Sequence, residues 1–189
     1  MPAVPDSSEP TDSEVNDTEV NDVEASDFEA SDFEVVKALL GRTPKTAFDV
    51  VVRRSDRVPV VTRNAPFERD GAPMPTRYWL LPSSLASEAI GRLEAAGGVR
   101  LVETIVDAAL IEASHLAYAA DRDRDIPVDH VGPRPVGGVG GTRVGTKCLH
   151  AHYAFFLAGG DDPVGRWVYD QLEPHQRDEP VMRDLPDDR

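Results

Sequence analysis

The sequence predicts an α+β fold, with a small antiparallel sheet of about three strands packed with four to five helices. Two β-branched runs come early, over residues 47–54 and 58–64, and the three polar residues between them are typical of a hairpin. Later segments instead space their apolar residues three and four apart, as amphipathic helices do. Strands and helices do not alternate along the chain, so a parallel sheet of βαβ units is not expected.

Local signals place the remaining elements of the first half. A first helix is expected to begin near Phe33 and to end at Gly41. A third strand, rich in aromatic residues, is predicted over residues 76–81. A second helix should follow Ser84, a candidate cap, and stop at the glycine pair 97–98.

The second half of the chain is predicted to be helical. The longest helix is expected over residues 101–121. Its apolar stripe consists of Leu101, Ile105, Ala108, Ala109, Ala113, Leu116 and Ala120. A last short helix should have Asp162 as its N-cap and Pro163 in its first turn, because aspartate and proline favour these positions.

Negative charge is concentrated in the first 34 residues, which hold six Asp, six Glu and no Lys or Arg. An imperfect five-residue repeat (SEVND, TEVND, VEASD, FEASD) runs through this segment and matches neither the helical nor the strand period. Its low hydrophobicity cannot offset the entropy of ordering, so residues 1–32 are predicted to be a disordered acidic tail. We expect a single domain over residues 33–172 and a flexible C-terminal tail over residues 173–189.

Composition argues against several classes of protein. The single cysteine permits no disulfide within the chain, and no apolar run approaches the length of a membrane span. We therefore expect a soluble, cytoplasmic protein without a membrane span. Residues 35–189 carry 22 acids against 20 bases, whereas a nucleic-acid-binding domain normally has a basic excess, so nucleic acid is not expected as a partner.

A glycine-rich segment over residues 136–160 is the candidate site. We predict that a helix begins just after Thr146, where open amide groups and the helix dipole attract anions. Glycines allow a close approach of the backbone to a ligand, and basic residues add positive charge. The predicted ligand-binding residues of this segment are Gly140, Gly141, Arg143, Gly145, Thr146 and Lys147. The principal hypothesis is a domain that binds a phosphate-bearing or carboxylate ligand around Cys148.

An enzyme is the alternative hypothesis for the same segment, with Cys148, His150 and His152 as the catalytic residues. Cys148 would be a nucleophile in the first helical turn, where the dipole lowers a thiol pKa. His150 and His152 would be acid–base groups or metal ligands. A structural zinc site needs four ligands and this segment offers at most three, so no metal site is assigned and the cofactor stays open. A cysteine that only packs in the core is the simplest explanation of Cys148.

Arginines also gather around the strand region, and Arg63 ends the second strand. Two interpretations of Arg63 stay open: recognition of phosphate or carboxylate together with Arg143 and Lys147, or a solvated sheet face. A P-loop is not indicated, because Thr146 interrupts the adjacent glycine and lysine that this motif requires.

Several segments together resemble a known family. They are LLGRTP, VVRRSDRVPVVTRNAP, DGAPMPTRYWL, GRLEAAGGV, RVGTKCLHAHYAFFLA and DPVG. In this order they are similar to the bacterial domain-of-unknown-function family 501, most specifically over residues 70–80, 92–99 and 147–152. The resemblance implies a cytoplasmic bacterial domain, often encoded near a septum-formation protein and an exopolyphosphatase.

The resemblance has a limit and suggests a further hypothesis. The family often has cysteines at the positions of Ser55 and Leu81, so a centre built on those cysteines could not operate in this chain. A third possibility is a scaffold that docks a cell-division or envelope partner through its acidic tails. An acidic tail can bind a basic partner, although charge runs most often only solvate the chain.

Overall fold

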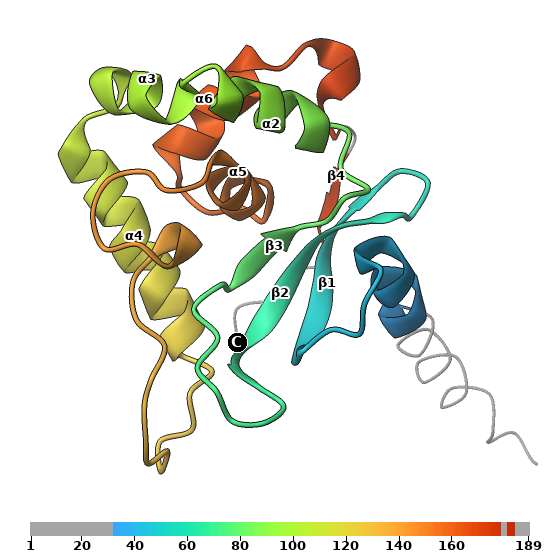
Figure 1. The fold of residues 1–189 in the computed structure, drawn as a ribbon, viewed down its shortest axis with the longest axis vertical. Coiled ribbons are helices and arrows are strands. Elements are labelled where there is room, and N and C mark those ends of the chain that lie inside the picture. Colours follow the sequence, from blue (N-terminus) through green and yellow to red (C-terminus); the bar gives the residue numbers. More distant parts are fainter. Residues whose placement is uncertain (1–31, 179–180, 184–189) are drawn as a thin grey trace, which may run out of the picture.

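The computed structural model describes residues 32–178 and 181–183 (Figure 1). The elements are a helix over residues 32–40, β1 (Thr46–Arg54), β2 (Pro59–Glu68), β3 (Tyr78–Leu80), α2 (Ser87–Ala95), α3 (Gly98–Ile105), α4 (Ala108–Asp123), the 3-10 helix η1 (Val139–Gly141), α5 (Leu149–Leu157), α6 (Pro163–Gln171), the 3-10 helix η2 (Pro174–Gln176) and β4 (Val181–Arg183). The predicted acidic tail lies outside the described residues except for Asp32, which begins the first helix. No helix in the described ranges is both long enough and apolar enough to cross a membrane.

The predicted α+β class is confirmed. The strands form one antiparallel sheet in the order β3-β2-β1-β4. β1 and β2 are the predicted hairpin, and Arg57 has a φ of 67° in the turn that joins them. A fourth, short strand adds to the three that were expected.

The end of the chain contributes η2 and β4, although the sequence predicts a flexible tail over residues 173–189. β4 pairs with the outer edge of β1, where Arg183 lies opposite Val52. Asp178, just before β4, is buried and accepts hydrogen bonds from the Ser84 hydroxyl at 2.6 Å and the Leu85 amide at 2.8 Å. These contacts connect the end of the chain to the segment before α2.

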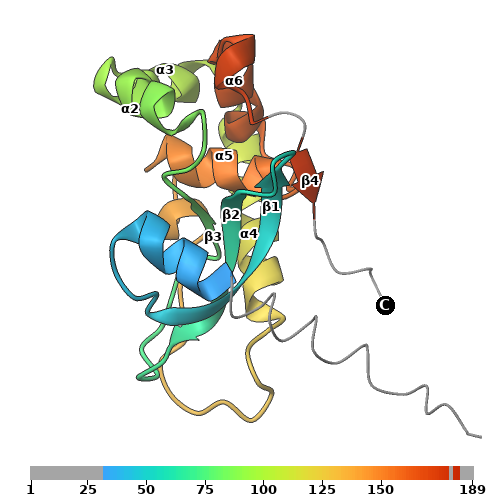
Figure 2. The ribbon, with the colours of Figure 1, turned by 90° about the vertical axis from the view of Figure 1, so that its right-hand side faces the viewer.

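The two faces of the sheet carry separate cores (Figures 1 and 2). On one face α5 packs against β3, and α2 and α6 pack against α5. On the other face Val36, from the helix over residues 32–40, packs with Val50 and Leu81 in a smaller cluster. Neighbouring residues of β3 point to opposite faces, so Tyr78 joins the larger core and Trp79 the smaller one.

The prediction of a single helix over residues 101–121 is wrong, because the chain forms α3 and α4 with a break between them. Val106 is extended, and the Asp107 side chain caps α4 by accepting from the Ala109 amide at 2.7 Å. The predicted apolar stripe also lies largely on the protein surface, since Leu101, Ile105 and Leu116 are 50, 57 and 67% exposed.

The buried side of α4 is largely polar instead, although it also includes Ile111. Ser114, His115, Tyr118 and Arg122 are all buried there. The Tyr118 hydroxyl accepts from the Arg77 amide at 2.6 Å, and Arg122 donates to the Gly137 carbonyl at 2.7 Å. The inner face of α4 therefore holds neighbouring backbone through hydrogen bonds, which explains why apolar periodicity points to the wrong side.

Candidate functional site

α5 is the central helix of the fold, and its beginning forms the candidate site. Seven of its nine residues are buried, so the helix is covered on nearly every side. Cys148 is the N-cap, with extended backbone angles of φ −151° and ψ 117°, and the helix starts at Leu149. The predicted start just after Thr146 is therefore wrong. The Thr146 amide instead donates to Glu103 Oε1 at 2.6 Å.

Three donor groups converge on one side of this helix start, and we call them the open cluster (Glu94, Cys148 and His150). A carboxylate oxygen, the sulfur and a ring nitrogen of these residues all lie within 4.8 Å of one another. His150 Nδ1 is 3.3 Å from Glu94 Oε2. All three residues are half-buried, so the cluster stays accessible from the surface.

Each end of the open cluster has a further hydrogen bond. His150 Nε2 lies 3.0 Å from the Ser87 carbonyl, which fixes the ring so that Nδ1 faces the cluster. Glu94 Oε1 accepts from the Leu149 amide at 2.6 Å, across 55 residues of sequence. The contact with Cys148, together with the Ser87 carbonyl and the Glu94 charge, raises the pKa of His150 to about 9 although burial opposes this.

A hollow of about 350 Å³ adjoins the open cluster. Its walls are Thr76, Tyr78, Trp79, Leu80, Gly140, Cys148, His150 and Ala151. Most of this lining is apolar, and the polar groups of Cys148 and His150 stand together in it. A molecule in the hollow would therefore meet a mostly apolar surface and one chemically active region.

His152 does not join the open cluster, although it lies only two residues beyond His150. Its Nδ1 is 2.8 Å from Asp162 Oδ2, and both side chains are fully buried. The ring of His115 lies 5.7 Å from that of His152. We call these three residues the closed cluster (His115, His152 and Asp162). Burial removes His152 from contact with any external molecule.

The predicted ligand-binding residues do not form one cationic pocket. Gly140 lines the hollow with a φ of 65°, but Arg143 and Lys147 are exposed. Arg63 donates to Asp49 at 2.8 Å on the neighbouring strand.

Of the remaining predicted residues, Gly145 and Thr146 lie beside a carboxylate of the chain itself. A side chain at Gly145 would lie 2.6 Å from Glu103 Oε1, and Gly141 instead lies against Pro75. The amides of Thr146 and Leu149 are bonded to glutamates, so internal carboxylates already occupy the positions expected for an external anion.

The model of a protein family described as "Protein of unknown function (DUF501)" matches residues 50–170 of the chain. The chain belongs to the DUF501 family. The DUF501 match contains the whole open cluster and the closed cluster, whereas the helix over residues 32–40 and β4 lie outside it. No curated protein and no solved structure matches the chain.

Glu94 is the residue of the site that sequence reasoning missed. It belongs to α2 and reaches Cys148 only through the tertiary packing of α2 against α5. One signal was available, because Glu94 lies in the segment GRLEAAGGV, one of those that carry the resemblance to the DUF501 family.

Proposed function

We propose that this DUF501 domain is a metal-dependent ligand-binding domain in which the open cluster holds a divalent transition-metal ion. The observation that carries the proposal is the convergence of three different donor groups, within 4.8 Å of one another, at the end of a hollow. A carboxylate oxygen, a cysteine sulfur and a histidine nitrogen are the three ligand types that zinc takes from proteins.

The surrounding hydrogen bonds support this proposal. A metal-binding histidine normally donates its second N–H to a carbonyl or carboxylate, and a metal-binding carboxylate is itself hydrogen-bonded. The Ser87 carbonyl lies in that position beside His150, at 3.0 Å from Nε2. The Leu149 amide donates a hydrogen bond to Glu94 Oε1 and so orients that carboxylate. Two of the three ligands are thus oriented before a metal arrives.

The donor set also favours a class of metal. A thiolate ligand favours zinc over magnesium or calcium, which prefer oxygen ligands alone. Three protein ligands leave a fourth position of a tetrahedral ion for water or another molecule, as in catalytic rather than structural zinc sites. In this domain the fourth position would open toward the hollow, where the ion would polarise an oxygen-bearing group of the bound molecule.

Metal content and cobalt substitution test the proposal. We expect about one zinc ion per chain in the wild type, and a thiolate-to-cobalt absorption band when cobalt replaces zinc. Cys148→Ser should abolish the band. Glu94→Gln should weaken zinc binding at least about tenfold, because Gln can keep the bond to the Leu149 amide but is a poor ligand.

His130→Gln is the matched control, since the His130 ring stacks on Phe67 and is not one of the three donors. This variant should bind zinc like the wild type. Wild-type protein without zinc and without a cobalt band would overturn the proposal. If Cys148 of that metal-free protein were alkylated rapidly, and His150→Gln slowed the alkylation, the nucleophile hypothesis would replace it.

The compartment and the partner are part of the same proposal. A cytoplasmic location suits the site, because a reducing compartment keeps the Cys148 thiol free to bind metal. A phosphate-bearing or carboxylate molecule is a suitable ligand for the open position of the ion. Docking of a basic, cell-division or envelope partner by the acidic tail stays a prediction, since nearly all of that tail lies outside the described residues.

A further inference from the structure

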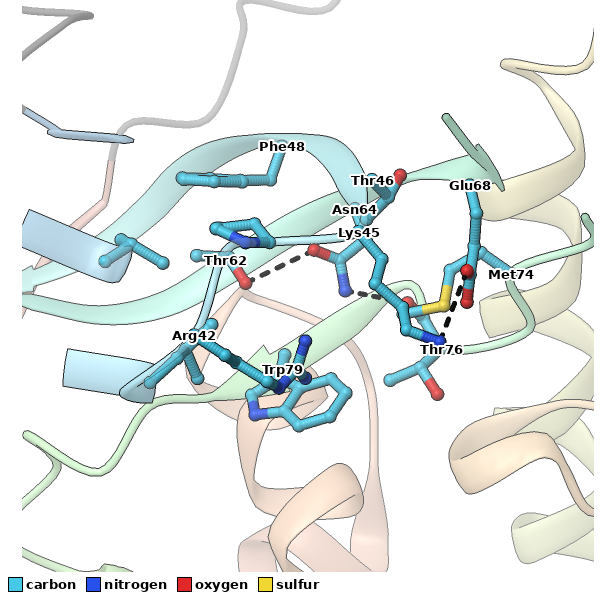
Figure 3. A pocket seen from close by; sticks show the side chains of 13 residues that line it. Arg42, Lys45, Thr46, Phe48, Thr62, Asn64, Glu68, Met74, Thr76 and Trp79 are labelled. Atoms are coloured by element: carbon cyan, nitrogen blue, oxygen red, sulfur yellow. Dashed lines mark hydrogen bonds and ion pairs between the residues drawn. The ribbon is translucent and has the colours of Figure 1, made fainter. Parts of the chain in front are cut away.

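A second hollow, of about 240 Å³, lies on the other face of the sheet (Figure 3). It is bounded by the helix over residues 32–40, the loop that follows it, and strands β1, β2 and β3. Thr76 and Trp79 line both this hollow and the one beside the open cluster. The open cluster itself contributes nothing to this second hollow.

The second hollow contains polar groups where an apolar core is expected. Thr62 and Asn64 are only 3 and 5% exposed, although they share this space with Phe48 and Trp79. The Thr62 hydroxyl donates to Asn64 Oδ1 at 3.4 Å, and Asn64 Nδ2 donates to the Thr76 carbonyl at 3.0 Å. In the view of Figure 3 this polar pair lies between the Phe48 and Trp79 rings.

The Asn64 carboxamide is therefore held in place but only partly used. A carboxamide has two N–H donors and two acceptor lone pairs, and the two bonds above take one of each. One donor and one acceptor stay available to a molecule in the hollow. Burying such a group on a sheet face costs free energy unless it gains partners, so a ligand with hydrogen-bonding substituents suits the site.

The charge at this hollow is cationic. Lys45 lies 3.6 Å from Glu68, so these two charges offset each other. Arg42 is exposed, and its guanidinium lies over the Trp79 ring at 5.7 Å. Among the described residues no carboxylate forms an ion pair with Arg42. The guanidinium that lies over the Trp79 ring thus has no ion-pair partner within the described residues.

We infer that this second hollow binds a small aromatic or heteroaromatic anion. The ring packs against Trp79, its substituents bond to the Asn64 carboxamide, and its anionic group pairs with Arg42. A volume of about 240 Å³ accommodates one substituted ring. This site is separate from the proposed metal centre and does not depend on it.

Salicylate is a suitable probe, because it combines a ring, a hydroxyl and a carboxylate. In two-dimensional NMR of the full chain it should shift the Trp79 indole N–H and the Asn64 side-chain amide signals. Arg42→Gln should weaken salicylate binding at least about tenfold, the loss expected for a charge-assisted hydrogen bond. Phenol, which lacks the charge, and acetate, which lacks the ring, should each bind at least about tenfold more weakly.

Arg69→Gln is the matched control, since the Arg69 guanidinium also lies over an aromatic ring, that of Phe33, at 5.7 Å. It should leave salicylate binding unchanged. The dispersed NMR spectrum itself shows whether each variant is folded. Absence of shifts at Trp79 and Asn64, equal effects of Arg42→Gln and Arg69→Gln, or equal binding of phenol and salicylate would each overturn the inference. Loss of the cobalt band in Cys148→Ser should not change salicylate binding, so the two sites are tested separately.

Discussion

His150 and His152 lie two residues apart on α5 and have opposite surroundings. His150 belongs to the open cluster, where it is half-buried and faces a hollow. His152 belongs to the closed cluster, where Asp162 holds it in a fully buried pair. The difference arises because residues two apart on a helix point in nearly opposite directions.

The comparison shows how one short helix can serve two purposes. The closed cluster ties α5 to α6, because Asp162 also caps α6 by accepting from the Gly165 amide at 2.7 Å. The three residues of the open cluster are half-buried, so an external molecule can reach them. Variants of the closed cluster should therefore change stability, and variants of the open cluster should change binding.

The largest effect is expected from Asp162→Ala. This change removes the cap of α6 and leaves the His152 ring nitrogen buried without its partner. We expect a loss of about 3–5 kcal/mol in the free energy of unfolding, measured by urea denaturation. Asp161→Ala, at the exposed neighbouring position, should change it by less than about 0.5 kcal/mol. Equal losses would mean that the closed cluster does not stabilise the fold.

Zinc should stabilise the protein through the open cluster alone. At a free concentration about 100 times Kd, an ion that binds only the folded state adds about 2.7 kcal/mol to the free energy of unfolding. His150→Gln should abolish this gain without a comparable loss of stability in the absence of zinc. A gain that survives His150→Gln would remove His150 from the site.

A steric change tests how tightly the closed cluster is packed. A Cβ at Gly138 would lie 2.4 Å from His115 Cβ and 2.6 Å from its Cα, and neither atom can move easily. Gly138→Ala should therefore cost about 1–3 kcal/mol. Gly91→Ala is a control that should raise the free energy of unfolding, because no atom lies within 4 Å of its added Cβ and alanine favours the α2 helix. Thermal unfolding of both variants compares them directly.

Acid should produce the smallest effect, on the side of the core that β3 and α4 share. Burial alone would raise the pKa of Asp121, but hydrogen bonds from Arg77 and Tyr78 hold it below the ordinary value of an aspartate overall. Because the folded pKa is the lower one, the carboxylate stabilises the fold above the unfolded pKa, and this contribution disappears as the pH falls through the folded value. Urea denaturation at a series of acidic pH values should show that the free energy of unfolding falls less steeply with acid in Asp121→Asn than in the wild type. Zinc binding at neutral pH should be unchanged in this variant. An identical slope in both proteins would contradict the assignment.

The sequence could predict those elements whose signals are local. The β1–β2 hairpin and the start of α6 were expected from β-branched runs and from the Asp162–Pro163 pair, and both are present. The split between α3 and α4 depends on the Asp107 cap, which competes with an uninterrupted apolar period. The orientation of α4 could not be predicted, since its buried polar residues bond to backbone that is distant in sequence.

The candidate site could be predicted only in part for the same reason. Cys148 and His150 were identified because they lie only two residues apart in the chain. Glu94 was not, because its contact with the start of α5 exists only after α2 has packed. The bonds of two glutamates from other helices to the amides at Thr146 and Leu149 could not be predicted either, because they too form only in the folded chain.

The short pairing of β4 with β1 has a consequence for aggregation. Without it, the outer side of β1 near Val52 would present unpaired N–H and C=O groups, a template on which a strand from another molecule can add. Trimming the chain before residue 178 would remove β4 and expose this edge. We expect the loss to appear as self-association during expression and storage, so expression vectors should extend past Arg183.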